Sequence, residues 1–281
     1  MSATDDRAPV GHERPDPATA AVHPGAARLA GRRVLVLGAG TQRSDDPEAP
    51  IGNGRAVSVL AGREGAAGAC WDRDGPAATE TAALVEAEGA PALAIVGDAS
   101  DPEMCAAAVG SAVTGLGGLD GVVLNVGIGR GRGLRETTVD DWDTTFAVNV
   151  RAHFLTCQAA LPHLTAGASI VFVSSVAGLR PGSRIPAYDA SKAALAGLGR
   201  HVAAEGARRG IRANVVAPGL IDTPLGRWAT AGRPSRQSTP VPLGRQGSAW
   251  EVAEVVTWLL SDRASYVTGQ VIAVDGGLST L

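Results

Sequence analysis

The sequence lacks the features that identify several common classes of protein. Its 281 residues include only three cysteines, which are too few and too far apart for a disulfide framework or a zinc site. We expect them to be small buried residues in a reducing compartment. No apolar run is long enough to span a membrane. Acids and prolines interrupt the N-terminus, where a signal peptide needs an apolar core.

Positive charge is not concentrated in the sequence either. Lysine and arginine are scattered, the net charge is -3 and the isoelectric point is about 6.0, so no nucleic-acid partner is indicated. No cluster of metal-ligand residues is apparent. We therefore expect a cytoplasmic protein whose partners include no nucleic acid, no membrane and no metal ion.

Two regions differ in composition. Residues 1–30 are rich in alanine, proline, aspartate and arginine and have no apolar periodicity, which predicts a disordered N-terminal tail. Residues 31–281 alternate short apolar runs with helix-like stretches and are predicted to form a single domain. The expected strands are 34–37, 68–71, 93–96, 122–124, 170–173, 214–217 and 271–274. The expected helices are 54–64, 76–88, 102–115, 138–164, 187–208 and 249–261.

This alternation predicts an α/β fold, a Rossmann-type doubly wound parallel sheet of about seven strands with helices on both faces. Ligands of such sheets bind at the carboxyl ends of the strands, near the switch in strand order. The segments that follow the strands are therefore the expected functional segments.

Tyr188 and Lys192 lie four residues apart in a predicted helix, so they share a face and point into the same space. A phenol with an unperturbed pKa of about 10 is a poor acid-base group at neutral pH, but an ammonium beside it lowers that pKa. Ser175, on the preceding segment, is placed to hold a substrate oxygen. Together these groups predict proton transfer to or from a carbonyl or alcohol oxygen, although the Tyr-x-x-x-Lys spacing by itself also occurs by chance in helices.

Glycines follow the first predicted strand, as in a loop that binds phosphate. They are Gly38 and Gly40 directly after the strand, and Gly52-Asn53-Gly54 at the start of the next helix. The insertion between them, residues 41–51, is longer than a compact phosphate loop needs. It also holds three acids, Asp45, Asp46 and Glu48, which repel phosphate unless they point outward. An ordinary glycine-rich turn is the alternative explanation.

The second predicted strand ends at Asp72, where a carboxylate hydrogen-bonds the adenosine ribose and repels a 2′-phosphate. This position favours NAD(H) over NADP(H), whereas the neighbouring Arg73, together with Arg43, favours a phosphate. A turn or helix-cap role is the alternative for Asp72.

The third and fourth predicted strands also end in candidate cofactor contacts. After the third strand, Asp98 beside Ala99 is expected to meet the adenine amino group or to cap the next helix. After the fourth come Asn125, Val126 and Gly127, and the glycine lets a cofactor approach the backbone closely.

Several motifs at suitable spacing resemble the short-chain dehydrogenase/reductase family over essentially all of residues 31–281. They are Ser175 with Tyr188-Asp189-Ala190-Ser191-Lys192, Asn149-Val150, Pro218-Gly219 with Thr223-Pro224, and Thr268-Gly269-Gln270 with Asp275-Gly276-Gly277. The sequence departs from the family at the 41–51 insertion, and at Leu124-Asn125-Val126-Gly127 where Asn-Asn-Ala-Gly is usual. The second departure indicates divergence in the central sheet.

The resemblance implies a role for each matching residue. Tyr188 is similar to the general acid/base, and Lys192 to the lysine that lowers its pKa and binds the nicotinamide ribose. Ser175 resembles the residue that orients the substrate carbonyl, and Asn149 the one that holds a water in a proton relay. The remaining implied cofactor contacts are Thr223 and the backbone near Ile221 on the carboxamide, with Pro218 and Gly219 beside the nicotinamide ring.

The leading hypothesis is an NAD(H)-dependent oxidoreductase that interconverts a small secondary alcohol and a ketone. An NADPH-dependent 3-oxoacyl thioester reductase and a catalytically silent dinucleotide-binding scaffold are the alternatives. The segment from Leu225 to about Leu243 is expected to form a mobile lid over the substrate, and nearby arginines make an anionic substrate conceivable. A homotetramer or homodimer is expected, since small residues such as Ala193, Ala194 and Gly197 share one helix face.

Overall fold

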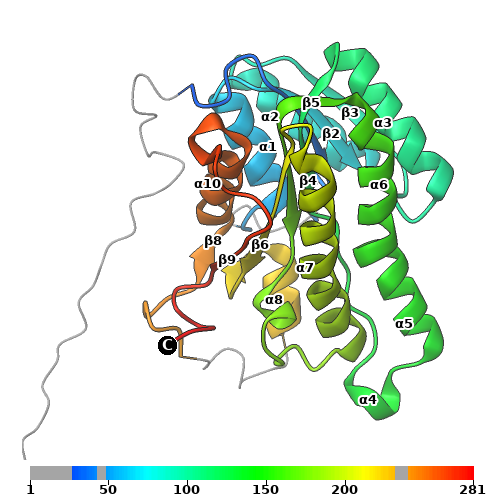
Figure 1. The fold of residues 1–281 in the computed structure, drawn as a ribbon. Helices are drawn as coiled ribbons and strands as arrows, with labels where there is room; N and C mark the ends of the chain where they lie inside the picture. Colours follow the sequence, from blue (N-terminus) through cyan, green and yellow to red (C-terminus); the bar gives the residue numbers. More distant parts are fainter. Residues whose placement is uncertain (1–26, 43–48, 232–239) are drawn as a thin grey trace, which may run out of the picture.

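The computed structural model describes residues 27–42, 49–231 and 240–281, and its centre is a seven-stranded sheet (Figure 1). The strand order is β3-β2-β1-β4-β5-β6-β9, and each neighbouring pair is parallel. The strands are β1 (Arg33–Leu37), β2 (Ala67–Asp72), β3 (Ala92–Val96), β4 (Leu119–Leu124), β5 (Leu164–Val173), β6 (Arg212–Pro218) and β9 (Val271–Val274). The predicted doubly wound sheet of about seven strands is confirmed.

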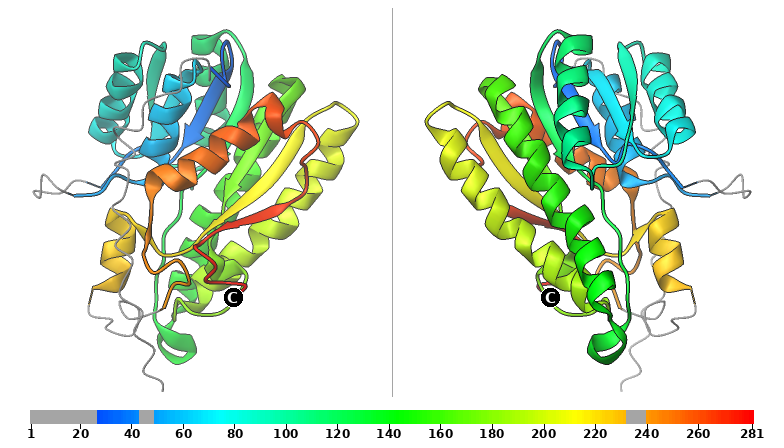
Figure 2. Two further views of the ribbon diagram at one scale, coloured as in Figure 1. Left: turned by 90° about the vertical axis from the view of Figure 1, so that its left-hand side faces the viewer. Right: turned by 90° about the vertical axis from the view of Figure 1, so that its right-hand side faces the viewer.

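Helices cover both faces of the sheet, as expected. The longer ones are α1 (Asn53–Arg63), α2 (Gly75–Ala87), α3 (Pro102–Leu116), α6 (Ala152–Ala160), α7 (Pro186–Ala207) and α10 (Ala249–Leu260). Leu35 and Leu37 of β1 pack in one buried cluster with α3, α6 and α7, while Val34 and Val36 pack in another with α1, α2 and α10. The two views of Figure 2 show α10 (orange) and α6 (green) on opposite sides of the sheet. Burial on both faces explains why the strands are unbroken apolar runs.

Side-chain caps fix where several helices begin. Asp74 accepts the N–H of Ala77 at the start of α2, and Asp101 accepts that of Glu103 at the start of α3. Ser248 forms a reciprocal capping box at the start of α10. These local signals explain why most predicted helices match the observed bounds closely. No helix among the described residues is both long and apolar enough to cross a membrane.

The prediction of one helix over 138–164 is wrong in detail. The segment contains α5 (Val139–Phe146), a π-helical turn (Ala147–Arg151), α6 and a short 3-10 turn (Leu161–His163). The chain then enters β5 at Leu164, earlier than predicted. A π-helical turn widens the helix locally, and such turns are frequent at functional sites.

Shorter elements near the carboxyl ends of the strands were not predicted. They are α4 (Gly133–Glu136), α8 (Pro224–Thr230) and a separate two-stranded sheet of β7 (Ile221–Asp222) and β8 (Gly247–Ser248). Helix α8 occupies the first part of the segment expected to be a lid. Residues 232–239 of that segment lie outside the described residues.

The ordered domain begins earlier than residue 31. Leu29 is fully buried in the core, and its N–H donates to the Glu64 carbonyl. Arg28 forms ion pairs with Glu64 and Glu254. The expected tail therefore does not extend to residue 30, and residues 1–26 lie outside the described residues. The three cysteines are buried and unpaired, as expected.

Candidate active site

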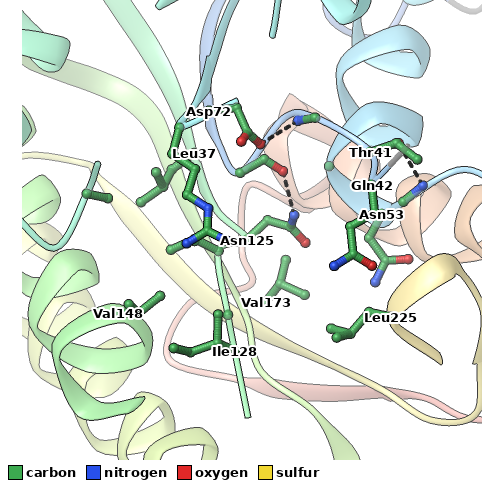
Figure 3. Close-up of a pocket in the computed structure, with 18 of the residues that line it drawn as sticks. Leu37, Thr41, Gln42, Asn53, Asp72, Asn125, Ile128, Val148, Val173 and Leu225 are labelled. Atoms are coloured by element: carbon green, nitrogen blue, oxygen red, sulfur yellow. Dashed lines mark hydrogen bonds between the residues drawn. The ribbon is translucent and has the colours of Figure 1, made fainter. Parts of the chain in front are cut away.

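A groove of about 320 Å³ opens at the carboxyl ends of the central strands (Figure 3). It lies where the strand order reverses between β1 and β4, the position at which doubly wound sheets bind ligands. The expected cofactor-binding residues that line it are Gly38, Gly40, Gly52, Asn53, Gly54, Asp72, Arg73, Asp98, Ala99, Asn125, Val126, Gly127, Tyr188, Lys192 and Thr223. The structure thus gathers segments that lie far apart in the sequence.

Pro218, Gly219 and Ile221 do not line this groove. Pro218 ends β6 and pairs with β9, and Ile221 pairs with Gly247 in the two-stranded sheet. Thr223 follows them, is buried, and caps α8 by accepting the N–H of Gly226. Of the expected cofactor contacts after β5 other than Tyr188 and Lys192, Thr223 therefore is the one that reaches the groove.

The start of α1 packs directly against the loop after β1. A Cβ on Gly54 would lie 1.8 Å from the Gly38 carbonyl oxygen, so no side chain fits there. Gly38 has a positive φ of 76°, and a Cβ on it would lie 2.9 Å from the Val126 nitrogen. This glycine contact brings the helix N-terminus close to the loop, as phosphate binding requires.

Asn125 joins two neighbouring strand ends. Its backbone N–H donates to the Leu37 carbonyl, and its Nδ2 donates to the Gly38 carbonyl over 2.8 Å (Figure 3). Leu124, the other departure from the family pattern, is fully buried in the core. Asn125 therefore links the end of β4 to the end of β1 and to the loop that follows β1.

The rim near Asp72 carries mostly negative charge. The Asp72 carboxylate accepts N–H groups from Gly40 (2.8 Å) and Asp74 (3.0 Å), which hold it in the groove wall. Exposed Asp74 and Asp98 line the same wall, opposed by Arg73. Hydrogen bonding to the Ser100 N–H, with a smaller contribution from Arg73, lowers the pKa of Asp98.

Two helix-cap alternatives are corrected by these contacts. Asp74, and not Asp72, caps α2, and Asp101, and not Asp98, caps α3. Asp98 instead bonds the N–H of Ser100 in a local turn at 2.8 Å. Both Asp72 and Asp98 therefore keep their carboxylates at the groove.

Lys192 and Tyr188 lie at the start of α7, and both line the groove. Lys192 is 3% exposed and donates from Nζ to the Val173 carbonyl at 3.0 Å. Its Nζ lies 5.8 Å from the centroid of the Tyr188 ring. Burial lowers the pKa of Lys192 to about 8. Gly127 makes room for this ammonium, because a Cβ there would lie 2.9 Å from Nζ.

Asn149 lies in the π-helical turn and is fully buried. Its Oδ1 accepts the Ile128 N–H, and its Nδ2 donates to the Ile128 carbonyl, each at 2.8 Å. The same Nδ2 donates to the Ser191 hydroxyl at 2.9 Å. Asn149 thus ties the segment after β4 to the helix that carries Tyr188 and Lys192.

The two serines after β5 have different surroundings. The Ser174 hydroxyl donates to the Lys192 carbonyl at 2.7 Å, so it fixes α7 against the sheet. Ser175 is partly exposed and accepts the Ala177 N–H at 3.2 Å. Ser175 does not line the 320 Å³ groove but follows Ser174, which does.

His153 was not identified from the sequence, although it lies one helical turn beyond Asn149. It is fully buried, and its Nε2 lies 3.1 Å from the Val126 carbonyl oxygen. This contact assigns the proton to Nε2. Burial and the charge of Lys192 lower the pKa of His153 to about 3, so the ring is neutral at physiological pH.

Other lining residues were not among the expected cofactor contacts, and most of them carry no distinctive chemistry. Figure 3 shows Ile128, Val148, Val173 and Leu225 around the apolar end of the groove. The further lining residues are Leu37, Thr41, Gln42, Asp74, Ala77, Gly97, Ser174 and Pro224.

The arginines expected near the mouth have several local partners. Arg180 donates to the Leu278 carbonyl at 2.6 Å, and Arg227 pairs with Asp222 at 2.8 Å. Arg130 contacts Asp140 at 3.4 Å between exposed side chains. The structure therefore gives no selective support to an anionic substrate. Arg43, Arg233 and Arg236, with the acids Asp45, Asp46 and Glu48, lie outside the described residues.

Comparison with known proteins agrees with this arrangement. A family model described as enoyl-(acyl carrier protein) reductase matches residues 50–279. The chain is 36% identical to the uncharacterized oxidoreductase YhxD of Bacillus subtilis, over 91% of this chain and 85% of that protein. It is 36% identical to the 3-oxoacyl-[acyl-carrier-protein] reductase FabG of Thermotoga maritima, over 89% of this chain and 99% of that protein. A solved short-chain dehydrogenase from Burkholderia cenocepacia, in complex with NADP, has a TM-score of 0.81 at 32% identity, covering 90% of this chain and 100% of that one.

A doubly wound sheet with a glycine-rich loop at its switch point is the architecture of dinucleotide-binding proteins. The similarities above extend over most of the chain and of its relatives. The chain belongs to the short-chain dehydrogenase/reductase family, and it is an oxidoreductase of that family, whose members bind NAD(P).

Proposed function

We propose that the protein is an NAD(H)-dependent oxidoreductase that interconverts a small secondary alcohol and a ketone. The observation that carries the proposal is the pairing of Tyr188 with the buried Lys192 at one end of the groove, where both side chains line the same cavity. A phenol beside a desolvated ammonium can exchange a proton with a substrate oxygen near neutral pH.

The groove suits a dinucleotide along its length. The close contact between Gly38 and Gly54 brings the N-terminus of α1 to the loop, where its backbone N–H groups would hold a pyrophosphate. Asp72 and Lys192 both line the groove, and we expect Asp72 to hold the adenosine ribose and Lys192 the nicotinamide ribose. When bound, the nicotinamide accepts or donates the hydride.

The chain's own residues supply proton transfer and orientation. During oxidation, Tyr188 as phenolate takes the hydroxyl proton of the alcohol, and during reduction it returns the proton to the carbonyl oxygen. The Lys192 ammonium stabilises the phenolate. Ser175 orients the substrate oxygen, and Asn149 supports a proton relay towards Lys192 while holding Ile128 in place.

Charge at the adenosine end supports NAD(H). Asp72, Asp74 and Asp98 carry three negative charges there against the one positive charge of Arg73, and this balance disfavours a 2′-phosphate. An Asp72→Ser variant is expected to narrow the preference, lowering the ratio of kcat/KM with NADH to kcat/KM with NADPH by about tenfold or more. A ratio that Asp72→Ser leaves unchanged would contradict this role of the carboxylate.

An NADPH-dependent 3-oxoacyl thioester reductase is the second candidate. Two observations favour it: Arg73 lines the groove beside Asp72, and the chain is similar to FabG along almost its full length. A guanidinium at this position suits a ribose phosphate.

A cofactor and substrate screen separates these candidates. The purified protein is assayed with NADH and NADPH against secondary ketones and 3-oxoacyl thioesters, and with NAD and NADP against secondary alcohols. Faster turnover of a simple ketone with NADH supports the proposal. Preference for NADPH and a thioester supports the second candidate, while dinucleotide binding without any turnover supports a silent scaffold.

We also propose that the protein is a cytoplasmic homotetramer or homodimer. Ala193 and Gly197 are exposed on α7, and Trp142 of α5 and Phe154 of α6 are 39% and 47% exposed. Exposed small residues and exposed aromatic rings suit close packing against a second copy. Analytical ultracentrifugation that finds only monomers at micromolar concentration would contradict this proposal.

A further inference from the structure

The loop at residues 38–41 is held by a hydrogen bond at each of its four positions. Asn125 donates to the Gly38 carbonyl at 2.8 Å, and the Thr81 hydroxyl donates to the Ala39 carbonyl at 3.1 Å. Asp72 accepts the N–H at position 40 at 2.8 Å. At position 41, the threonine hydroxyl accepts the Gly52 N–H at 2.9 Å. Three side chains outside the loop and one inside it therefore define its shape.

The last of these bonds spans the insertion, because it joins Thr41, the first residue of the insertion, to Gly52, which follows the insertion. Thr41 and Gly52 are eleven positions apart in the sequence, yet a Cβ on Gly52 would lie 3.8 Å from the Thr41 Cα. Because a Cβ lies about 1.5 Å from its own Cα, the two Cα atoms are within about 5 Å, close to the 3.8 Å between neighbours in a chain. The two residues that flank positions 42–51 thus lie almost as close together as neighbours in the chain.

We propose that Thr41 is a positioning residue that closes the phosphate loop across the insertion, and that residues 42–51 are dispensable for dinucleotide binding. The inference rests on the proposed function for its ligand. Removing residues 42–51 would join Thr41 directly to Gly52 and leave Gly38-Ala39-Gly40-Thr41-Gly52-Asn53-Gly54, a compact spacing of glycines like that of an uninterrupted phosphate loop.

The hydroxyl is needed because the insertion frees the two ends from each other. A direct peptide bond would keep residues 41 and 52 adjacent, whereas with ten residues between them no single covalent bond sets their separation. Asn53 and Gly54, which follow Gly52, open α1 and line the groove, so their position sets the fit of a pyrophosphate. Thr41 restores with one hydrogen bond the constraint that the insertion removes.

The test compares six variants of the protein. Thr41→Val removes the acceptor at nearly constant size, and Thr41→Ser keeps it. Excision of residues 42–51 is made with and without Thr41→Val. Thr114→Val, at an exposed site on α3, is the matched control. Dissociation constants for NADH and NADPH are measured by fluorescence titration without substrate, and thermal unfolding of each apo protein shows whether it is folded. Among the described residues that the excision removes, Gln42 alone lines the groove, and a Gln42→Ala variant reports on its contribution.

In the full-length protein, Thr41→Val is expected to raise the dissociation constant of the preferred dinucleotide about threefold to tenfold, the range of one hydrogen bond. Thr41→Ser and Thr114→Val are expected to bind within about twofold of the wild type. The excised protein is expected to bind as well as the Gln42→Ala variant, and Thr41→Val is expected to have little further effect in it. In turnover assays, Thr41→Val should raise the KM for the dinucleotide and leave kcat nearly unchanged, because Tyr188 and Lys192 are untouched.

Three results would overturn the inference. Equal weakening by Thr41→Val with and without residues 42–51 would mean that the hydroxyl contacts the dinucleotide itself. A folded excised protein that no longer binds would show that the insertion belongs to the site. Unchanged binding by full-length Thr41→Val would show that the bond to Gly52 is not needed, and this comparison stands even if the excised protein fails to fold. If the wild type binds no dinucleotide at all, the proposed function fails first.

Discussion

Replacing Lys192 by methionine should abolish turnover and yet stabilise the folded protein at neutral pH. Burial lowers the pKa of Lys192 from 10.5 to about 8, and at about 1.4 kcal/mol per pH unit this corresponds to a cost of about 3 kcal/mol for keeping the charge buried. Methionine fills a similar volume without a charge. It also removes the hydrogen bond to the Val173 carbonyl, which costs about 1 kcal/mol.

At pH 7 the net effect is a stabilisation of about 2 kcal/mol, or a rise in Tm of roughly 4–8 °C. The extra stability of Lys192→Met over the wild type depends on pH, because the folded wild type releases the Lys192 proton at a lower pH than its unfolded state does. Between pH 8 and 10.5 the unfolded state binds the extra proton, so the wild type gains stability as the pH rises. At pH 10 the remaining cost of the charge is about 0.8 kcal/mol, and the two proteins should be nearly equal in stability.

Urea unfolding of both apo proteins at pH 7 and pH 10 measures this difference. Lys192 is the only lysine in the sequence, so selective isotope labelling of lysine gives one side-chain ammonium signal whose titration reports its pKa directly by NMR. A pKa near 10.5, or a Lys192→Met protein that is less stable than the wild type by the same amount at both pH values, would refute the argument from burial.

Other consequences of the site geometry are testable in the same way. Gly127→Ala should lower kcat at least tenfold with little change in Tm, because the new Cβ would lie 2.9 Å from Lys192 Nζ and displace it from Tyr188; unchanged kcat would contradict this. His153→Leu should make the free energy of unfolding less sensitive to acid. The pKa of His153 is lowered from 6.5 to about 3, so the wild type loses about 3 kcal/mol between pH 6.5 and pH 4 as the unfolded state takes up the proton. Urea unfolding at pH 6.5 and pH 4 should show that the variant loses less unfolding free energy on acidification than the wild type does. An equal loss in the two proteins would exclude His153 as the source of the acid sensitivity.

Most of the fold could be predicted because the signals are local. Each strand of the parallel sheet is an apolar run, and helices such as α2 and α3 begin at acidic caps, Asp74 and Asp101. The π-helical turn could not be predicted in this way. It lies where Asn149 bonds the backbone of Ile128, 21 residues away in the sequence, and no spacing within the helix reveals that partner.

The residues of the candidate site that could be predicted are likewise those with a local signal in the sequence. Tyr188, Lys192 and Asp72 were predicted because a residue type, a helical spacing or a strand end identified them. Thr41 and His153 escaped because their significance depends on the partners they contact, Gly52 and the Val126 carbonyl. The sequence offered Asp72 and Asp98 as alternative caps of the helices that follow them. In the structure Asp74 caps α2 and Asp101 caps α3. In this region several aspartates lie close together, and only the backbone geometry distinguishes them.

The measurement that tests the central claim most directly compares the two tyrosines of the sequence. Tyr188 lines the groove, whereas Tyr266 is fully exposed and serves as the matched control. With a substrate found in the screen, Tyr188→Phe is expected to bind the dinucleotide within about threefold of the wild type and to lose at least about 1,000-fold in kcat. Tyr266→Phe is expected to retain both. Turnover by Tyr188→Phe within tenfold of the wild type would contradict the claim that this hydroxyl transfers the proton.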